Sequence, residues 1–330
     1  MPKVIRFHQI GGPENLKFEE EPARQPGPGE VKLGVEAVGL NRAESLYFRG
    51  QYMEKPELPS RLGYEAAGVV EAVGPDVDKS WIGKRVATVP GYSQNRYGVL
   101  AGEAIVPASV LGEYPNNLSS IEAAAVWMQY VTAWGALVHF GHVAKGDYVI
   151  IPAASSSVGL AAIQIANDAG ATSIAATRTS KKRDELLSLG AAHVIATEEE
   201  DLVVRVNQIT AGKGARLIFD PVAGPFVEKL AQAAAHQAIM FEYGALSLAS
   251  TPFPFFHALR KGLTMRGYTL HEITRDPKAM TEAKSYIYNR LADGRFRPKI
   301  DKTFPFAQSI EAYKYLESNA QIGKIVITVP

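Results

Sequence analysis

The sequence of 330 residues contains no cysteine, and this absence removes several kinds of chemistry at once. Without cysteine there is no disulfide, no thiolate nucleophile and no zinc site with a sulfur ligand. The seven histidines show no pair at metal-ligand spacing on a helix, and His139 and His142 fall where a helix is expected to end. We therefore expect a protein without a metal site.

The chain also lacks a strong charge bias and long apolar runs. Its 35 basic and 34 acidic residues leave a formal charge of +1, which favours neither nucleic acid nor an anionic membrane as a partner. No window reaches about 18 uninterrupted apolar residues, and Met1 to Phe7 does not begin a signal peptide. We expect a cytoplasmic protein with a small-molecule partner, although a chain without cysteine also suits other compartments.

The length and the 46% hydrophobic content favour two domains over one. Up to about residue 120, short β-type runs such as Lys3 to Phe7 and Arg85 to Val89 alternate with turns rich in proline and glycine. This pattern is typical of a small all-β, barrel-like domain. From Ser120 to about Phe140 an alanine-rich pattern predicts one helix, with Ser119 or Ser120 as its cap.

After that helix, strand and helix patterns alternate as far as Tyr243. The series begins with a buried strand at Tyr148 to Ile151 and a helix from Val158 to Ala169. Such alternation predicts a doubly wound parallel sheet. Beyond about residue 270 we expect a helix from Ala279 to Leu291 and a closing strand from Lys324 to Val329.

The first strand-turn-helix of this series has the position of a dinucleotide site. Small residues in the turn let the backbone approach a pyrophosphate, which the helix N-terminus then binds. Ala154, Ser156 and Gly159 stand at the three glycine positions of a G-x-G-x-x-G loop, so only the last is glycine. The expected cofactor-binding residues are Ser155, Ser156, Ser157, Val158 and Gly159. The alternative is a serine-rich turn that caps an ordinary helix.

The end of the second strand indicates which dinucleotide is bound. NAD-specific folds usually carry an acidic residue there, whereas this chain has a hydroxyl-rich and basic segment from Thr177 to Arg183. Thr177, Arg178 and Lys182 suit a 2′-phosphate, so we expect NADPH rather than NADH. The alternative is a solvated helix start, but the helix dipole opposes cations there unless an anion is bound.

Several motifs along the chain together resemble a known family. They are Phe7 to Glu14, Pro28 to Val31, Gly39 to Asn41, Leu62 to Gly74, Ala153 to Gly159 and Gln321 to Ile325. The sequence resembles the zinc-independent quinone oxidoreductase and zeta-crystallin branch of the medium-chain dehydrogenase/reductase superfamily. The resemblance implies an α/β protein: a GroES-like β-barrel catalytic domain from residues 1–122 and 271–330, and a Rossmann-type doubly wound domain from 123–270. It also implies a homodimer that pairs edge strands, here Leu263 to Leu270.

Zinc-dependent relatives need a cysteine and a Gly-His-Glu motif that this chain lacks. Asn41 stands near the first ligand position, and Tyr64 replaces the histidine in Gly63-Tyr64-Glu65. Without a Lewis acid to ionise an alcohol, hydride transfer to an already polarised acceptor is favoured. We therefore expect reduction of a quinone or an α,β-unsaturated carbonyl (enone).

Reduction of an enone requires a hydrogen-bond donor at the carbonyl oxygen and a proton source. The resemblance assigns Asn41 to the pocket, with a turn-terminating asparagine as the alternative. Many relatives carry a tyrosine donor five residues after this asparagine, but here that residue is Leu46 and the candidate donor, Tyr47, comes one residue later. Tyr64 and Tyr52 are alternative donors, and we favour Tyr64. The alternative interpretation is that Tyr64 is simply a core residue.

The resemblance also assigns residues in the central part of the chain. Three of them precede the Rossmann unit and face nicotinamide or substrate in relatives: Trp127, Gln129 and Thr132. The alternative for Trp127 is a core residue, because an aromatic residue at helical spacing is more often part of the core. Tyr243 and Gly244 follow a Rossmann strand where backbone binds the carboxamide of the cofactor. Phe255, within Pro252 to Phe256, either closes over an apolar substrate or packs beneath a loop.

Together these features predict an NADPH-dependent reductase of quinones or enones that transfers hydride directly and without metal. Two alternatives remain at this point. One is a metal-free NADP-dependent alcohol or carbonyl oxidoreductase, and the other is a low-turnover NADPH-binding protein with a structural or regulatory role.

Overall fold

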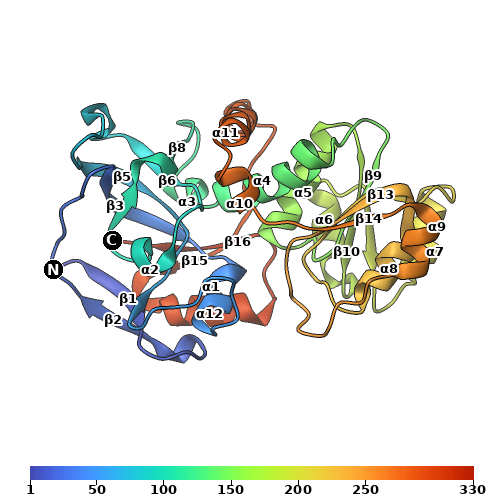
Figure 1. The fold of residues 1–330 in the computed structure, drawn as a ribbon, viewed down its shortest axis with the longest axis horizontal. Helices are drawn as coiled ribbons and strands as arrows, with labels where there is room; N and C mark the ends of the chain where they lie inside the picture. Colours follow the sequence, from blue (N-terminus) through green and yellow to red (C-terminus); the bar gives the residue numbers. More distant parts are fainter. The chain divides into compact units, whose positions relative to one another are not determined.

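The computed structural model describes residues 1–330 and separates into two compact units. The split unit contains Met1–Met128 and Lys284–Pro330, and the central unit contains Gln129–Ala283. Figure 1 shows the blue N-terminal strands and the red C-terminal strands within the same unit. None of the helices is both long and apolar enough to pass through a membrane.

The junctions lie at 128/129 and 283/284, whereas the sequence predicts 122/123 and 270/271. Helix α3 (Ser120–Ala123) packs on strands of the split unit, which keeps the following residues there. On the other side, Ile273 of α10 (His271–Thr274) lies against Gly135 of the central unit. Packing after the expected junctions thus decides where the chain passes from one unit to the other.

The central unit is built on the doubly wound parallel sheet that the sequence predicts. Its strand order is β11-β10-β9-β12-β13-β14. The bounds are β9 (Tyr148–Ile151), β10 (Thr172–Thr177), β11 (His193–Ala196), β12 (Ala215–Asp220), β13 (Ala234–Glu242) and β14 (Thr264–Gly267). The order reverses beside β9, so the turn after β9 opens at the topological switch point where such sheets bind ligands.

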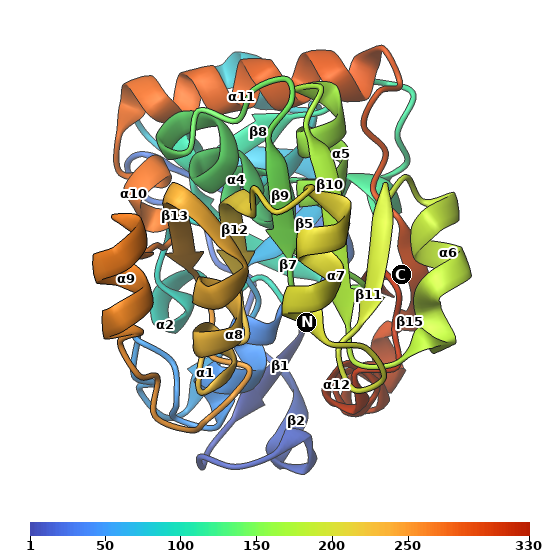
Figure 2. The ribbon, with the colours of Figure 1, turned by 90° about the vertical axis from the view of Figure 1, so that its right-hand side faces the viewer.

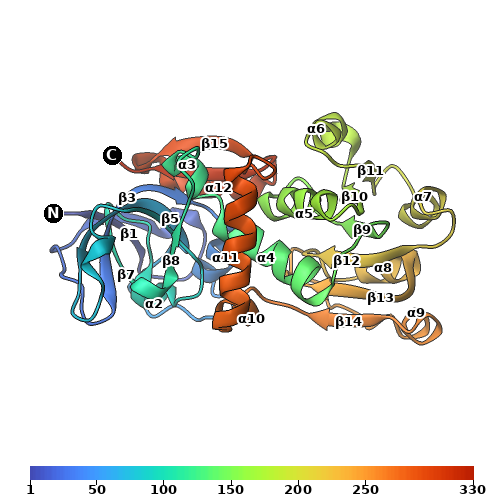
Figure 3. The same ribbon diagram turned by 90° about the horizontal axis from the view of Figure 1, so that it is seen from above.

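Helices cover both faces of this sheet, which is why its strands are almost continuously apolar. Val149, Ile150 and Ile151 of β9 are completely buried. Figure 3 shows α5 and α6 on one side of the strands and α7, α8 and α9 on the other, and Figure 2 shows α7 and α8 in front of the sheet. Their bounds are α5 (Ser157–Asp168), α6 (Arg183–Ser188), α7 (Leu202–Ile209), α8 (Phe226–Ala233) and α9 (Phe255–Lys261).

Strand β14 forms one edge of the sheet, within the segment from Leu263 to Leu270 that the sequence predicts as an edge strand. An edge strand has one row of backbone groups without a strand partner. Its pairing with a second copy of the chain stays a prediction.

The split unit holds a seven-stranded sheet and a three-stranded sheet. The larger sheet has the order β15-β16-β3-β5-β6-β8 with β7 also paired to β3, and the smaller has the order β2-β1-β4. The bounds are β1 (Lys3–Phe7), β2 (Leu16–Glu20), β3 (Glu30–Gly39), β4 (Ser60–Arg61), β5 (Glu65–Val73), β6 (Arg85–Thr88), β7 (Glu103–Pro107), β8 (Leu111–Glu113), β15 (Ile300–Pro305) and β16 (Lys324–Thr328). Strands from both ends of the chain therefore share the larger sheet.

Strand β3 joins the two ends of the chain in this sheet. It pairs antiparallel with β5, with β7 and with the C-terminal strand β16. Register shifts near Lys32 and Val35 interrupt its ladder with β5. Such bulges bend a strand, which allows one long strand to serve several neighbours. Three helices of the unit were not predicted from the sequence: α1 (Arg42–Phe48), α2 (Gln94–Tyr97) and α12 (Ser309–Ser318).

The single helix predicted from Ser120 to Phe140 is wrong. The segment forms α3, then α4 (Trp127–Trp134), and then a π-helical stretch from Gly135 to Phe140. Ser119 caps α3 in a capping box with Glu122, as one of the two predicted caps. At the break, the Ala124 carbonyl packs so closely on Gly39 that a Cβ there would be 1.9 Å from its oxygen.

Candidate active site

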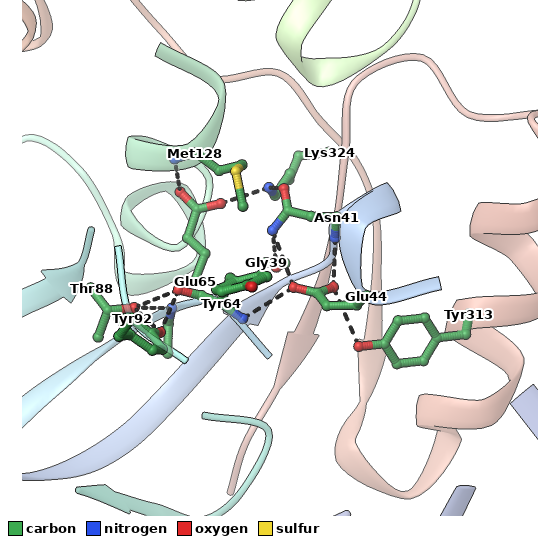
Figure 4. A network of polar contacts seen from close by, with 11 residues as sticks. Gly39, Asn41, Glu44, Tyr64, Glu65, Thr88, Tyr92, Met128, Tyr313 and Lys324 are labelled. Carbon is green, nitrogen blue, oxygen red and sulfur yellow. Dashed lines mark hydrogen bonds and ion pairs between the residues drawn. The ribbon is translucent and has the colours of Figure 1, made fainter. Parts of the chain in front are cut away.

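A buried ion pair is the centre of a polar network in the split unit. The Lys324 ammonium donates to Glu65 Oε2 at 2.7 Å and to Asn41 Oδ1 at 2.6 Å. Both charged side chains are 0% exposed. Figure 4 shows how the three side chains converge from β16, from β5 and from the residue before α1. The sequence reading assigned no role to Lys324 or Glu65, although both lie in the motifs that carry the resemblance.

The second oxygen of Glu65 places the first turn of α4. Glu65 Oε1 accepts the backbone N–H of Met128 at 3.0 Å. The first N–H groups of a helix have no partner within the helix, so a carboxylate there is favourable. One buried carboxylate therefore connects β5, the C-terminal strand and the start of α4.

Asn41 is the N-cap of α1, in a capping box with Glu44. Its side-chain nitrogen donates to the Gly39 carbonyl at 3.1 Å and to Glu44 Oε1 at 3.3 Å. Its side-chain oxygen accepts from Lys324, so both ends of the amide are engaged within the protein. This arrangement favours a structural role, and donation by Asn41 to a substrate stays a prediction.

Glu44 is a functional candidate that the sequence reading missed. It is fully buried and accepts hydrogen bonds from the backbone of Asn41 at 2.7 Å and of Tyr64 at 3.1 Å. Burial raises the pKa of Glu44 to about 7, although these hydrogen bonds and the charge of Lys324 act in the opposite direction. Its position three residues after Asn41 is the capping-box spacing, which was the available signal in the sequence.

Two of the three candidate tyrosine donors, Tyr64 and Tyr47, lie in different surroundings. Tyr64 is 2% exposed, and its hydroxyl donates to Glu54 Oε2 at 3.3 Å. Tyr47 is completely buried, with its hydroxyl 2.6 Å from Ser60 Oγ and its ring packed edge-on against Phe7. The structure brings Tyr64, and not Tyr47, into the network around Asn41.

Trp127 and Tyr52 complete the predicted residues of the split unit. Trp127 is 1% exposed and lies against Gly112, where an added Cβ would meet the indole at 2.5 Å. This close packing favours the interpretation of Trp127 as a core residue. Tyr52 is partly exposed, and its ring centroid lies 6.1 Å from that of Tyr64.

In the central unit, the turn between β9 and α5 has the compact form that a dinucleotide needs. Ser156 caps α5 by accepting the Gly159 N–H at 3.0 Å. A Cβ at Gly159 would lie 2.6 Å from the Ala154 carbonyl oxygen, so helix and turn approach closely only because this residue is glycine. Ala153 adopts a left-handed conformation with φ of 47°, which completes the sharp turn.

The basic segment after β10 reaches this turn. Lys182 Nζ donates to Ser155 Oγ at 3.2 Å, so two predicted cofactor-binding residues lie together. Thr177 ends β10, and the Arg178 side chain is exposed beside it. Arg183 is not available to a phosphate in the same way, because its guanidinium contacts Glu200 and the Val194 carbonyl.

The ends of β12 and β13 carry the residues predicted for the carboxamide end of the cofactor. Gly244 lies against Pro221, where an added Cβ would be 2.9 Å from the carbonyl oxygen. The Tyr243 ring stacks on the Phe219 ring, with 3.9 Å between the ring centroids. The buried Tyr243 hydroxyl has no hydrogen-bond partner. Gly244 therefore fits a close backbone approach, whereas the Tyr243 side chain belongs to the packing of the unit.

The remaining predicted residues lie on α4 and α9. Gln129 and Thr132 are 2% and 6% exposed, and the side-chain oxygen of Gln129 is buried without a hydrogen-bond partner. Phe255 is 56% exposed at the start of α9. The exposure of Phe255 does not favour packing beneath a loop. A substrate contact for any of the three stays a prediction.

A buried pair of carboxyl groups lies next to Tyr243. Asp220 and Glu242 are in register on β12 and β13, and Asp220 accepts backbone N–H groups of Val222 at 2.8 Å and Ala223 at 2.9 Å. No backbone N–H stabilises the Glu242 carboxylate. Burial, and then the charge of Asp220, raise the pKa of Glu242 to about 8. Glu242 is therefore the member of the pair that holds a proton near neutral pH.

The donor set of the split unit does not fit a catalytic zinc ion. No three His, Cys, Asp or Glu side chains gather as metal ligands would. The Asn41 amide and the Tyr64 phenol occupy the positions where zinc-dependent relatives carry ligands. The neighbouring Glu65 carboxylate is already paired with the Lys324 ammonium. A second cation beside Lys324 would be repelled.

Comparisons with known proteins match two successive parts of the chain to two family models. A model described as the alcohol dehydrogenase GroES-like domain matches residues 27–139, and one described as zinc-binding dehydrogenase matches residues 157–285. Quinone oxidoreductase 1 of Escherichia coli (strain K12) is 30% identical over 99% of this chain and 99% of its own. A 2-haloacrylate reductase of a Burkholderia species is 29% identical over 97% of each chain.

A solved structure shows the same fold. The crystal structure of Escherichia coli quinone oxidoreductase complexed with NADPH superposes with a TM-score of 0.91, at 28% identity and over 99% of each chain. The likeness extends over both units of the chain.

Replacing Lys324 by methionine should destabilise the protein strongly. The substitution leaves Glu65 as a buried charge without its partner, which costs about 3–5 kcal/mol in comparable cases. Urea unfolding followed by circular dichroism measures the change. Lys314→Met, at an exposed position on α12, is the matched control and should have little effect. A loss from Lys324→Met no larger than that of the control would contradict the assigned role of the ion pair.

Replacing Glu242 by glutamine should flatten the pH dependence of stability. The pKa of Glu242 is raised from 4.5 to about 8 in the folded protein, so the native state binds more protons between these values. The free energy of unfolding therefore falls as pH rises through this window. Thermal melts between about pH 5 and pH 8 should show a smaller decline for Glu242→Gln than for the wild type. The exposed Glu198→Gln variant should behave like the wild type, and equal slopes for all three proteins would refute the assignment.

Proposed function

Because the chain belongs to the quinone oxidoreductase branch of the medium-chain dehydrogenase/reductase superfamily, we propose that it is an NADPH-dependent reductase of quinones or α,β-unsaturated carbonyls. At the coarser level it is an NAD(P)-dependent reductase of this superfamily. The observation that carries the finer proposal is the Lys324–Glu65 ion pair. The carboxylate of Glu65, the last residue of the Gly-Tyr-Glu motif, is bound to the Lys324 ammonium and is therefore not available as a metal ligand. Nothing in this donor set ionises an alcohol, whereas quinones and enones are already polarised.

Neutral phenols supply the hydrogen-bond donors that such an acceptor needs. Burial raises the pKa values of Tyr64 and Tyr52, so both hydroxyls keep their protons near neutral pH. Bound NADPH supplies the hydride. As negative charge develops on the acceptor oxygen, a phenol donor stabilises it more than it stabilises the starting carbonyl. The similarity to a 2-haloacrylate reductase supports an activated alkene as one substrate class.

The central unit supports NADPH as the cofactor. The N-terminus of α5 faces the turn that contains Ser155 and Ser156, and helix N-termini bind phosphate through free N–H groups. Lys182 already contacts Ser155, and Arg178 lies exposed at the end of β10. We propose that these two cations bind the 2′-phosphate and that the turn binds the pyrophosphate.

Removing both cations should weaken NADPH binding much more than NADH binding. Each charge-assisted contact to phosphate contributes about 1.5–3 kcal/mol, and NADH lacks the 2′-phosphate. Titration of nicotinamide fluorescence gives the Kd of each cofactor for the wild type and for Arg178→Ala with Lys182→Ala. Lys213→Ala, at an exposed position after α7, controls for the loss of a surface cation. Equal losses for NADPH and NADH would refute the 2′-phosphate assignment.

The proposed activity is tested by NADPH oxidation with a panel of acceptors. We expect turnover of 1,4-naphthoquinone or of an open-chain enone by protein treated with a chelator, and slower turnover with NADH. Activity only with alcohols and NADP⁺ would favour the alcohol or carbonyl oxidoreductase. NADPH binding without turnover of any acceptor would instead favour a low-turnover binding protein.

A further inference from the structure

The segment after β10, which carries the cations proposed for the 2′-phosphate, already binds an anion of the protein itself. The Ser180 N–H donates to Glu199 Oε1 at 2.9 Å. Ser180 lies midway in sequence between Arg178 and Lys182, the two proposed phosphate ligands. A backbone N–H between two cations is a group that a phosphate oxygen would bind. Glu199 therefore occupies a donor that the 2′-phosphate would otherwise use.

The pairing of two neighbouring strands brings Glu199 to this segment. Strands β10 and β11 are parallel neighbours in the central sheet (Figure 2), and their pairing continues beyond the strand ends. The Glu198 N–H donates to the Arg178 carbonyl at 2.9 Å. Glu199 is the next residue, so the turn after β11 lies directly against the basic turn after β10. The contact with Ser180 thus follows from the strand pairing.

The adjacent acid, Glu200, has a different role. Its carboxylate accepts the Ala196 N–H at 2.9 Å and forms ion pairs with Arg183 and Arg205. These contacts hold Glu200 within the fold. Glu199, by contrast, is exposed, and its carboxylate is held by Ser180. An exposed contact of this kind can be exchanged for a ligand without disturbing the packing of the unit.

Glu199 and a 2′-phosphate cannot share the Ser180 N–H. Hydrogen bonds from Ser180, first from its backbone and then from its side chain, lower the pKa of Glu199, so the carboxylate is ionised near neutral pH. A phosphate monoester carries about 1.5–2 negative charges at this pH. NADPH must therefore displace Glu199 from Ser180. NADH has an uncharged ribose hydroxyl at the same place and does not have to displace it.

We propose that Glu199 limits the preference for NADPH over NADH by competing with the 2′-phosphate for the Ser180 N–H. This inference rests on the proposed NADPH site and adds to it a residue that determines specificity. Arg178 and Lys182 favour NADPH, whereas Glu199 acts against the phosphate. The chain is therefore expected to prefer NADPH and still to bind NADH.

The test is the variant Glu199→Gln, which removes the negative charge and keeps a side-chain oxygen that accepts the Ser180 N–H. Titration of nicotinamide fluorescence gives the Kd of both cofactors. We expect the Kd of NADPH to fall by about tenfold and that of NADH to change by less than about twofold, because only the phosphate is repelled by the charge. The gain should shrink between about 0.05 M and about 0.5 M salt, since charges at an exposed site are screened.

The matched control is Glu198→Gln, which removes the same charge from the preceding, exposed residue. Glu198 contacts the segment through its backbone, which the substitution retains. Its effect on the Kd of NADPH should be clearly smaller than that of Glu199→Gln. Equal effects would replace competition at Ser180 by a general effect of negative charge, and would overturn the proposal.

A second variant tests whether the effect passes through the Ser180 N–H. Ser180→Pro removes this donor, and Thr179 already has the extended conformation that suits a residue before proline, with φ of −125° and ψ of 164°. Without the N–H there is nothing to compete for. Glu199→Gln should therefore change the Kd of NADPH little in the Ser180→Pro protein, and additive effects of the two substitutions would contradict the proposal.

Adenosine 2′,5′-bisphosphate and AMP separate the 2′-phosphate from the rest of the cofactor. Isothermal titration should show tighter binding of the bisphosphate to Glu199→Gln than to the wild type, and unchanged binding of AMP. If the wild type binds NADPH and the variant leaves every Kd unchanged, the competition is overturned and the proposed reductase stands. If the wild type binds neither NADPH nor NADH, the proposed function is overturned together with this inference.

Discussion

The structure of the split unit depends on one buried ion pair. An ammonium and a carboxylate that are both withdrawn from water are tolerated only if they meet each other and find hydrogen-bond partners for their remaining atoms. Lys324 and Glu65 satisfy this condition through Asn41 and the Met128 N–H. The requirement brings β16 to the start of β5 and α1, so the last strand of the chain must complete the sheet that the first strands begin.

This constraint also limits the chemistry that remains available. Glu65 and Asn41 are occupied by Lys324, and Glu44 is occupied by the cap of α1. Tyr52 and Glu54 are partly exposed, and the buried Tyr64 side chain contacts both of them. A site built on phenols suits acceptors that are polarised before they bind, which is why the proposed substrates are quinones and enones.

The buried carboxyl groups of the two units are stabilised in different ways. Glu65 is compensated by a full positive charge, so it is buried as an anion. Glu242 lies beside Asp220 with no cation between them. Near neutral pH Glu242 keeps its proton, which avoids a second negative charge next to Asp220. The first arrangement makes the split unit sensitive to loss of a single lysine. The second makes the stability of the central unit depend on pH at the strand ends where the cofactor's carboxamide is expected.

The sequence alone determined the elements whose signal lies within a few residues. Strands β1 and β9, the parallel order of the central sheet and the turn before α5 follow from apolar runs, small turn residues and caps that are local. The tertiary structure decided the rest. It broke the predicted helix at Ala124, placed Tyr47 in the core, and brought Lys324 to Asn41 from 283 residues away in the chain. The physical reason is that a strand or turn is selected by its own backbone preferences, whereas the partner of a buried charge is selected by packing between distant segments.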